Sequence, residues 1–155
     1  MVYSQFETLL KEFEPFFGCR LQPNANQSCL IRMKDGVTVQ MELDPSNLVI
    51  GCRVGTHLSG RYRHQLIQQA LKSNGTSLLS AGIFGFSHRS SSLILFIKID
   101  PAALSANQIP SLLTPFLVRA KEWTEAISRG EIPALHTAFS EKIPAGLFGL
   151  ERREH

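Results

Sequence analysis

The sequence predicts an α+β fold, a single domain in which helices pack on one twisted antiparallel sheet. Two kinds of apolar spacing predict it: some segments have the period of a helix, and others alternate as strands do. They follow one another as helix, three strands, helix, two strands, helix. The chain has 155 residues, 43% of them hydrophobic, which suits one compact domain. We expect this domain to span residues 1–130, and residues 131–155 to form an irregular C-terminal tail.

A first helix is predicted near the N-terminus. Ser4 followed by Glu7 is the signature of a capping box, in which each side chain bonds the backbone N–H of the other residue. Pro15 predicts an end at about Glu14, because a proline ring clashes with the preceding helical turn. Four residues at helical spacing form the apolar face: Phe6, Leu9, Leu10 and Phe13.

Residues 28–43 predict a β-hairpin around an Asp-Gly turn. A two-residue loop would pair Lys34 with Val37 and split the large apolar side chains between the two faces. A three-residue loop with a left-handed glycine pairs Met33 with Val37 and gathers every large apolar side chain except that of Leu30 on one face. We favour the three-residue loop, because burial of one face specifies strand register. The outward face then carries Arg32, Thr38, Gln40 and Glu42.

A turn, a strand and a second helix follow this hairpin. The turn covers residues 44–47, the strand residues 48–54 and the helix about residues 61–73. The Asn-Gly pair after Ser73 is a usual helix end. One stripe of the helix is apolar and consists of Tyr62, Leu66, Ile67, Ala70 and Leu71.

A second hairpin is predicted from residues 81–86 and 93–99, joined by a polar loop over residues 87–91. Both of its faces are apolar, whereas a one-sided antiparallel sheet alternates apolar with polar residues. We therefore expect these strands to be covered twice, by their own helices and by a partner subunit. Leu93, Leu95, Ile97 and Ile99 lie on one side, and Ile94 and Phe96 on the other.

The last helix has two candidate starts. A capping box at Ser105 would place two prolines inside the helix, whereas Thr114 as cap puts Pro115 at the first helical position. We expect a kink or break near Thr114, then a helix to about Ser128, stopped by Gly130. Its apolar stripe, which we assign to the core, is Leu113, Phe116, Leu117, Ala120, Trp123 and Ile127.

Composition and charge narrow the class of protein. The formal net charge is +3, from 16 Lys and Arg against 13 Asp and Glu. The basic residues are scattered apart from clusters at residues 61–64 and 152–153, which give only weak support to a nucleic-acid partner. The sequence shows no signal peptide and no apolar run of the ~20 residues that span a bilayer. With only 3 cysteines, far apart, we expect a reduced, cytoplasmic protein without a membrane partner.

No set of residues looks equipped for catalysis, a metal or a cofactor, so we assign none. The histidines have no carboxylate, cysteine or histidine at metal-ligand spacing. Ser87 and His88 are neighbours in a loop, where a polar turn is the simpler interpretation than a catalytic pair. Cys52, on an apolar strand, is interpreted as a small buried hydrophobe. Three glycines inside strands are interpreted as bulges or points of close backbone approach: Gly51, Gly82 and Gly85.

Two local stretches make this series of elements resemble a known family. Residues 66–74 (LIQQALKSN), followed by residues 81–86 (AGIFGF), are similar to a leucine-rich helix that ends in Asn and the small-residue strand after it. Residues 115–123 (PFLVRAKEW) are similar to a closing helix with a recurring aromatic, alanine and tryptophan. Over roughly residues 1–130 the chain resembles the class I type III secretion chaperones, the CesT/SycE (Tir chaperone) family.

The resemblance implies a cytosolic bacterial chaperone that dimerises with itself or with a related chaperone. It would bind the N-terminal segment of a secreted effector, keep it soluble and deliver it to the secretion ATPase. The effector would add an extended strand to a sheet edge and fill apolar patches. The implied dimer interface is Tyr62, Leu66, Ile67, Ala70, Ile83 and Phe84. The residues we assign to effector binding are Phe6, Leu10, Phe13, Leu30, Arg32 and Gln40.

The chain departs from this family in two ways. Members are usually acidic, whereas this sequence has a pI of about 8.9, and the tail after Gly130 is longer than the family core requires. One hypothesis is that residues 143–150 shield the client groove when it is empty. The alternative functions are a nucleic-acid-binding α/β module, supported only by the mild positive charge, and a regulator that shares the scaffold. A third is an undetected small-molecule enzyme, because a fold does not dictate a function.

Overall fold

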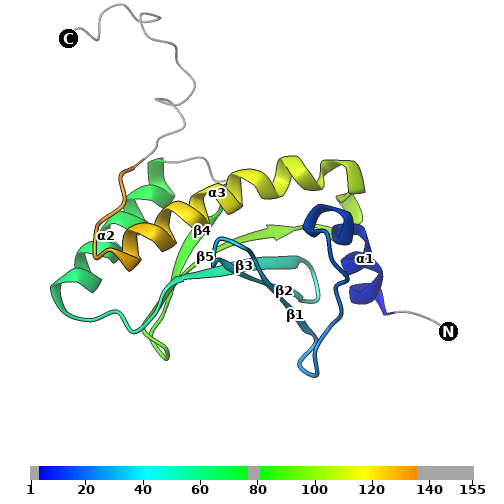
Figure 1. Cartoon of the computed structure of the whole chain (residues 1–155), viewed down its shortest axis with the longest axis horizontal. Helices are drawn as coiled ribbons and strands as arrows, with labels where there is room; N and C mark the ends of the chain where they lie inside the picture. Colours follow the sequence, from blue (N-terminus) through cyan, green and yellow to red (C-terminus); the bar gives the residue numbers. More distant parts are fainter. Residues whose placement is uncertain (1–3, 77–80, 136–155) are drawn as a thin grey trace, which may run out of the picture.

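The computed structural model describes residues 4–76 and 81–135 of the chain. Its helices and strands follow the predicted order (Figure 1). The strands form one sheet in the order β1-β2-β3-β5-β4, in which all neighbours are antiparallel, so the α+β class is confirmed. The elements are α1 (Gln5–Phe17), β1 (Ser28–Arg32), β2 (Thr38–Leu43), β3 (Leu48–Gly55), α2 (Gly60–Thr76), β4 (Ile83–Ser87), β5 (Ser92–Ile99) and α3 (Ile109–Ser128).

Helix α1 starts as predicted and ends later than predicted. The capping box is present, with the Glu7 backbone N–H donating to Ser4 Oγ at 3.1 Å and the Ser4 N–H donating to the Glu7 carboxylate at 2.9 Å. The expected end at Glu14 is wrong, because the helix runs through the exposed Pro15. The missing proline N–H costs one hydrogen bond only, in the last turn. Gly18, with φ 71°, then caps the helix through its N–H bond to the Glu14 carbonyl at 2.8 Å.

The β1–β2 hairpin has the three-residue loop that its apolar pattern predicts. The Met33 N–H donates to the Val37 carbonyl at 2.8 Å, and Ile31 lies opposite Val39. Gly36, with φ 92°, supplies the left-handed residue of the loop. This register buries Ile31 and Val39 and leaves Leu30 outside. Burial of one face has therefore selected the register.

Helix α3 is continuous across the predicted break. A break near Thr114 is wrong, since one helix spans Ile109–Ser128 with Pro115 inside it. The capping box at Ser105 belongs to a short 3-10 turn that leads into the helix, so the helix needs no second cap at Thr114. The predicted C-terminal end is confirmed, and Gly130 follows it with φ 72°.

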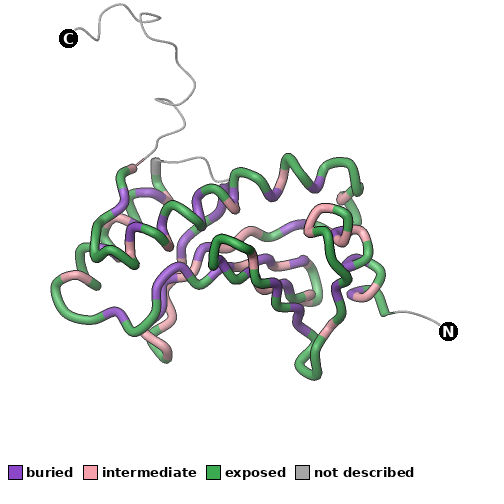
Figure 2. The backbone as a smooth tube through the Cα atoms, in the orientation of Figure 1, coloured by how far each residue is buried: buried purple, intermediate pink, exposed green. Residues whose placement is uncertain are grey.

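The hydrophobic core lies between one face of the sheet and the helices. Helix α3 crosses above the sheet in Figure 1, with α1 beside its N-terminal half and α2 beside β4. The buried positions of the strands and the inner sides of the helices face one another (Figure 2). The Trp123 ring packs 4.1 Å from the Phe84 ring, centroid to centroid. The core assignment is confirmed for four residues of the α3 stripe, Leu113, Phe116, Ala120 and Trp123, while Leu117 and Ile127 are half-buried.

Side-chain hydrogen bonds attach β4 and the C-terminal segment to the helices. The Asn74 amide accepts from the Phe84 N–H at 2.8 Å and donates to the Phe84 carbonyl at 3.0 Å. The expected helix end at the Asn-Gly pair is therefore wrong. The Asn74 side chain contacts β4, and α2 continues to Thr76. Tyr62 Oη donates to the Glu131 carbonyl at 2.7 Å, which holds the start of the predicted tail against α2. The proposed shielding segment, residues 143–150, lies outside the described residues.

Candidate binding surface

One face of the sheet is not covered by any helix in the described part of the chain (Figure 1). We call it the open face. The strand register arranges its residues in three rows across the strands. The first row is Arg32, Thr38, Arg53, Ile94 and Gly85; the middle row is Leu30, Gln40, Gly51, Phe96 and Ile83; the third is Glu42, Val49 and Lys98. The open face is thus apolar in the middle and charged at both ends.

Gly51 forms the floor of a hollow in the open face. It lies between Gln40 and Phe96 in the middle row, and its missing side chain leaves room between them. The hollow has a volume of about 820 Å³ and is lined by open-face residues of β1, β2, β3 and β5. Of the two interpretations of Gly51, a bulge or close backbone approach, the bulge is wrong, because the strand is regularly paired there and the irregularity falls at residues 53–55.

The outer edge of β1 is free along part of its length. Met33 and Val37 form a hydrogen-bonded pair, so alternation along an antiparallel ladder points the N–H and C=O of Leu30 and Arg32 away from β2. Nothing in the described residues pairs with this edge at those positions. At Ser28 the edge is closed by its own loop, since Asn24 bonds both backbone groups there. An extended peptide could therefore add to the edge beside Leu30 and Arg32.

Charge is distributed unevenly over the open face. Lys98 in the third row lies near Asp44, whose carboxyl pKa is lowered by hydrogen bonds from the Asn47 and Ser46 backbones and by this lysine. Glu42, in the same row, accepts a hydrogen bond from the Gln40 amide. This end therefore carries two carboxylates and one lysine. The first row carries two arginines, Arg32 and Arg53, and no carboxylate.

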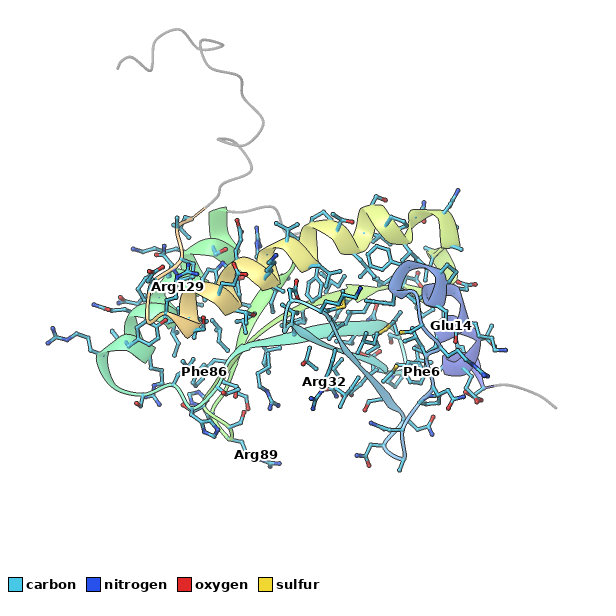
Figure 3. All side chains as sticks on the ribbon, in the orientation of Figure 1. Phe6, Glu14, Arg32, Phe86, Arg89 and Arg129 are labelled. Atoms are coloured by element: carbon cyan, nitrogen blue, oxygen red, sulfur yellow. The ribbon has the colours of Figure 1, made fainter. Side chains whose placement is uncertain are left out.

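The residues predicted to bind effector fall into two groups. Leu30, Arg32 and Gln40 lie together on the open face, where Leu30 is 60% exposed. Figure 3 shows Arg32 on the side of the sheet away from α3. The three phenylalanine and leucine positions of α1 lie in the core instead, with at most 4% exposure: Phe6, Leu10 and Phe13. A partner cannot touch these three in this conformation, because the amphipathic face of α1 packs onto the protein's own sheet.

The residues predicted to form the dimer interface are also divided. Leu66, Ala70 and Phe84 are buried within the protomer. Tyr62 and Ile67 are half-buried, and Ile83 is 39% exposed at the edge of the open face. The interface stays a prediction, and these positions leave only its outer residues accessible. Leu71, predicted on the apolar stripe, is 64% exposed, so the accessible apolar part of α2 is centred there.

The open face contains residues that sequence reasoning did not assign to a site: Val49, Gly51, Arg53, Ile94, Phe96 and Lys98. The two-faced apolar pattern of residues 93–99 had already placed Ile94 and Phe96 away from the core. The same alternation could have located Val49 and Arg53, because they alternate with the buried residues of β3.

The polar groups considered for chemistry have structural contacts. The Ser87 hydroxyl accepts from the Ser90 hydroxyl at 3.2 Å, and the His88 ring meets the Phe86 ring edge-on at 5.2 Å. Cys52 is 2% exposed, and burial raises the pKa of its thiol to about 11, so it is protonated at neutral pH, as expected of a buried hydrophobe. In residues 4–76 and 81–135 no three metal-ligating side chains come together. None of the helices described there is long and apolar enough to cross a membrane.

Known structures share this architecture. The chain is 20% identical to a chain of the HopA1–SchA chaperone–effector complex, covering 78% of this chain and 94% of that one with a TM-score of 0.60. It is 21% identical to a chain of the Yersinia pestis type III secretion chaperone SycH in complex with a YscM2 fragment, with coverage of 75% and 97% and a TM-score of 0.56. For the ExoU–SpcU complex of Pseudomonas aeruginosa, the values are 16% identity, 79% and 97% coverage, and a TM-score of 0.59. At these identities the likeness establishes the fold.

The sequence itself identifies the family. No curated protein is significantly similar to this chain in sequence. The model of the Tir chaperone protein (CesT) family, however, matches residues 8–124, from α1 to the C-terminal half of α3. This range includes every strand of the sheet and the whole open face. The chain therefore belongs to the Tir chaperone protein (CesT) family.

Proposed function

We propose that this protein is a type III secretion chaperone, which binds the N-terminal segment of one or more secreted effectors in the bacterial cytosol and keeps that segment soluble for export. The open face of the sheet supports this proposal best. It combines exposed apolar side chains, a hollow floored by Gly51 and a free strand edge at β1. Large exposed apolar surface on a folded protein is typical of a binding site.

The geometry suits an unfolded polypeptide better than a compact ligand. A free edge offers backbone hydrogen bonds to any extended segment, whatever its sequence, and the adjoining hollow accepts every second side chain of that segment. The structural neighbours include complexes described as chaperone with effector. Family membership and this surface together favour binding of a protein over binding of a nucleic acid. The nucleic-acid alternative is supported only by the positive charge.

We also propose that the protein forms a dimer, either with a second copy of itself or with a related chaperone. Leu71 of α2 and Ile83 of β4 are both large, apolar and exposed on elements that contact each other. Covering them with a second subunit would remove apolar surface from water. The interface would then contain the outer residues of the predicted set, with Leu71 added.

Co-expression with candidate secreted proteins tests the function. We expect one client to form a stable complex through roughly its first hundred residues, with an interface well above ~1,000 Å². Gly51→Val should weaken the complex at least about tenfold, because a branched side chain would fill the hollow. A Cβ atom at Gly51 meets its nearest neighbours at 3.7 Å, so the substitution should leave the fold intact.

Thr114→Val is the matched control, since Thr114 is exposed on α3, away from the open face. It adds an apolar surface residue of the same kind without touching the hollow. Equal client affinity of the two variants, measured by calorimetry, would exclude the open face as the binding site. Failure to find any client that co-purifies would count against the chaperone function itself.

A further inference from the structure

Positive charge is concentrated in one part of the chain. Between Asp44 and Asp100 the sequence has no Asp or Glu, although this stretch includes six of the 16 Lys and Arg residues. The stretch contains β3, α2, β4 and β5. The small overall charge of +3 therefore conceals a long segment of a single sign.

The tertiary structure brings arginines of this segment to one end of the open face. Strands β1, β3 and β4 run in the same direction, so the ends of β1 and β3 and the β4–β5 turn lie at the same end of the sheet. The loop before α2 is tied to this turn, because Leu58 N–H donates to the Ser91 carbonyl at 3.0 Å and the Ser91 hydroxyl donates to the Leu58 carbonyl at 2.6 Å. We call the resulting cluster the arginine end: Arg32, Arg53, Arg63 and Arg89.

Each member of the arginine end is exposed and comes from a different element. Arg32 and Arg53 flank Thr38 in the first row of the open face. The Arg63 guanidinium lies 5.9 Å from the centroid of the Phe86 ring. Phe86 alternates with Ile83 and Gly85 of the open face and packs against the core, so Arg63 lies beside the helix-covered side of β4. Arg89 lies at the tip of the β4–β5 turn (Figure 3).

The cluster is not neutralised within the described residues. The ion pair found there joins Arg129 to Glu131, beyond the end of α3. Asp35 is the acidic residue of the neighbouring β1–β2 turn, and its carboxylate accepts from the Val37 N–H at 3.1 Å. Arg32, Arg53 and Arg89 against this one carboxylate leave a net positive potential at this end of the open face, and Arg63 adds to it from the other side of β4. The opposite end, with Glu42, Asp44 and Lys98, has two carboxylates against one lysine and is therefore net negative.

We propose that the client segment bound on the open face consists of an apolar part with an acidic run at one end. Its apolar side chains fill the middle row, and the adjoining run of Asp or Glu lies over the arginine end. This inference rests on the proposed chaperone function and adds the chemistry of its client. Charge complementarity accelerates encounter and fixes which way an extended segment runs along the sheet. In the protein without a client the arginine side chains are hydrated, so their mutual repulsion lowers the folding stability only a little.

An acidic polypeptide fits this surface better than a nucleic acid. Leu30, Phe96 and Ile83 occupy the row directly beside the arginines, and a phosphate backbone crossing that row would place charges on apolar side chains. A polypeptide can place apolar side chains there and also use the free backbone groups of β1.

Synthetic peptides of about 12 residues, long enough to cross the sheet at ~3.3 Å per residue, test the proposal. Each would carry an alternating valine segment, followed by four glutamates, four lysines or four glutamines, with a fluorescent label for anisotropy. We expect the glutamate peptide to bind about tenfold more tightly than the glutamine peptide at low salt, and the lysine peptide to bind more weakly than either. The preference should shrink at about 0.5 M salt, where charges are screened over ~4 Å.

The double variant Arg32→Gln with Arg53→Gln should abolish the preference for glutamate. Arg20→Gln with Lys121→Gln removes the same charge from exposed positions outside the strands that form the open face, and should keep the preference. Equal binding of the three peptides would overturn the proposal, as would failure of the glutamate peptide to bind at about 1 mM. Displacement of that peptide by a single-stranded RNA that binds more tightly would overturn it in favour of nucleic acid. None of these outcomes depends on finding a client by co-expression, which tests the chaperone function separately.

Discussion

At the scale of single residues, Gly51 in β3 and Gly82 just before β4 show opposite constraints. A Cβ atom at Gly51 would make ordinary contacts at 3.7 Å, whereas a Cβ atom at Gly82 would lie 2.8 Å from Leu95 Cδ1, in the core. Gly82 also has φ 112°, a backbone conformation that other residues rarely adopt. One glycine therefore serves the binding surface and the other serves the packing of β4 against β5.

Gly82→Ala should destabilise the protein by about 3 kcal/mol, through backbone strain and overpacking together. Urea unfolding followed by circular dichroism measures this. Gly85→Ala is the control, because its Cβ would meet only the end of the half-buried Phe96 ring, at 3.3 Å. We expect that control to change the stability by less than about 1 kcal/mol. Equal effects of the two substitutions would contradict the assigned role of Gly82.

At the scale of elements, the two edge strands of the sheet differ in what satisfies their backbone. The outer edge of β4 is closed by side chains, since Asn74 bonds both backbone groups of Phe84 and Arg119 donates to the Gly82 carbonyl at 3.2 Å. The outer edge of β1 is free at Leu30 and Arg32. Free edges invite strand addition. An added strand can therefore form backbone hydrogen bonds with the free groups of β1. At this part of β4 the corresponding groups are already bonded to side chains.

Leu30→Pro should prevent strand addition while keeping the fold. The N–H that proline removes points away from β2, and edge strands tolerate proline in that orientation. We expect client affinity to fall further than in Leu30→Ala, which removes the side chain and keeps the N–H. Ile31→Pro removes a bond to β2 and should cost about 1–3 kcal/mol of folding stability. Calorimetry for binding and urea unfolding for stability separate the three variants, and client affinity equal in Leu30→Pro and Leu30→Ala would rule out strand addition here.

Asn74→Ala should lower the free energy of unfolding by about 1–3 kcal/mol, because the Phe84 N–H and carbonyl lose their partners at a half-buried position. Gln68→Ala, at an exposed position of the same helix, is the control and should have little effect. Chemical denaturation of the two variants gives the comparison. A stability of Asn74→Ala equal to that of the unmodified protein would show that water replaces the amide without cost.

At the scale of the whole molecule, a single sheet separates two surfaces with different tasks. The covered face holds the core, and the open face carries the hollow, the free edge and the arginine end. Exposed apolar side chains also occur on α2, at Leu71. A chaperone of one domain can in this way present a client surface on the sheet and a self-association surface on α2, which meet at Ile83 on the edge of the open face.

Light scattering should give a mass of about twice the 17.3 kDa of one chain if the α2 surface forms a homodimer. Leu71→Glu should then yield monomers, because it places a charge in a desolvated interface. Val118→Glu is the matched control, since Val118 is 54% exposed on α3. A dimer that survives Leu71→Glu, or dissociates in Val118→Glu, would place the interface elsewhere.

Much of the architecture follows from local patterns. The alternation in residues 28–43 predicted the hairpin register, and the two apolar faces of residues 93–99 predicted a sheet with a second face left for a partner. The ends of α1 and α3 were less predictable, because a helix can continue past a proline when the loss of one hydrogen bond is offset by packing of the rest.

Alternation along each strand is a property of neighbouring residues, so the sequence alone specifies which side chains share a face of the sheet. It does not specify which face the helices cover or which apolar residues stay accessible. Phe6, Phe13 and Leu66 became core residues, whereas Leu30, Leu71 and Ile83 stayed exposed. The lack of acidic residues between Asp44 and Asp100 is visible in the sequence, but only strand order brings the arginines of this stretch beside Arg32. Contacts between distant segments decide which face is covered and which apolar residues are buried, because burial depends on what packs over a residue in space.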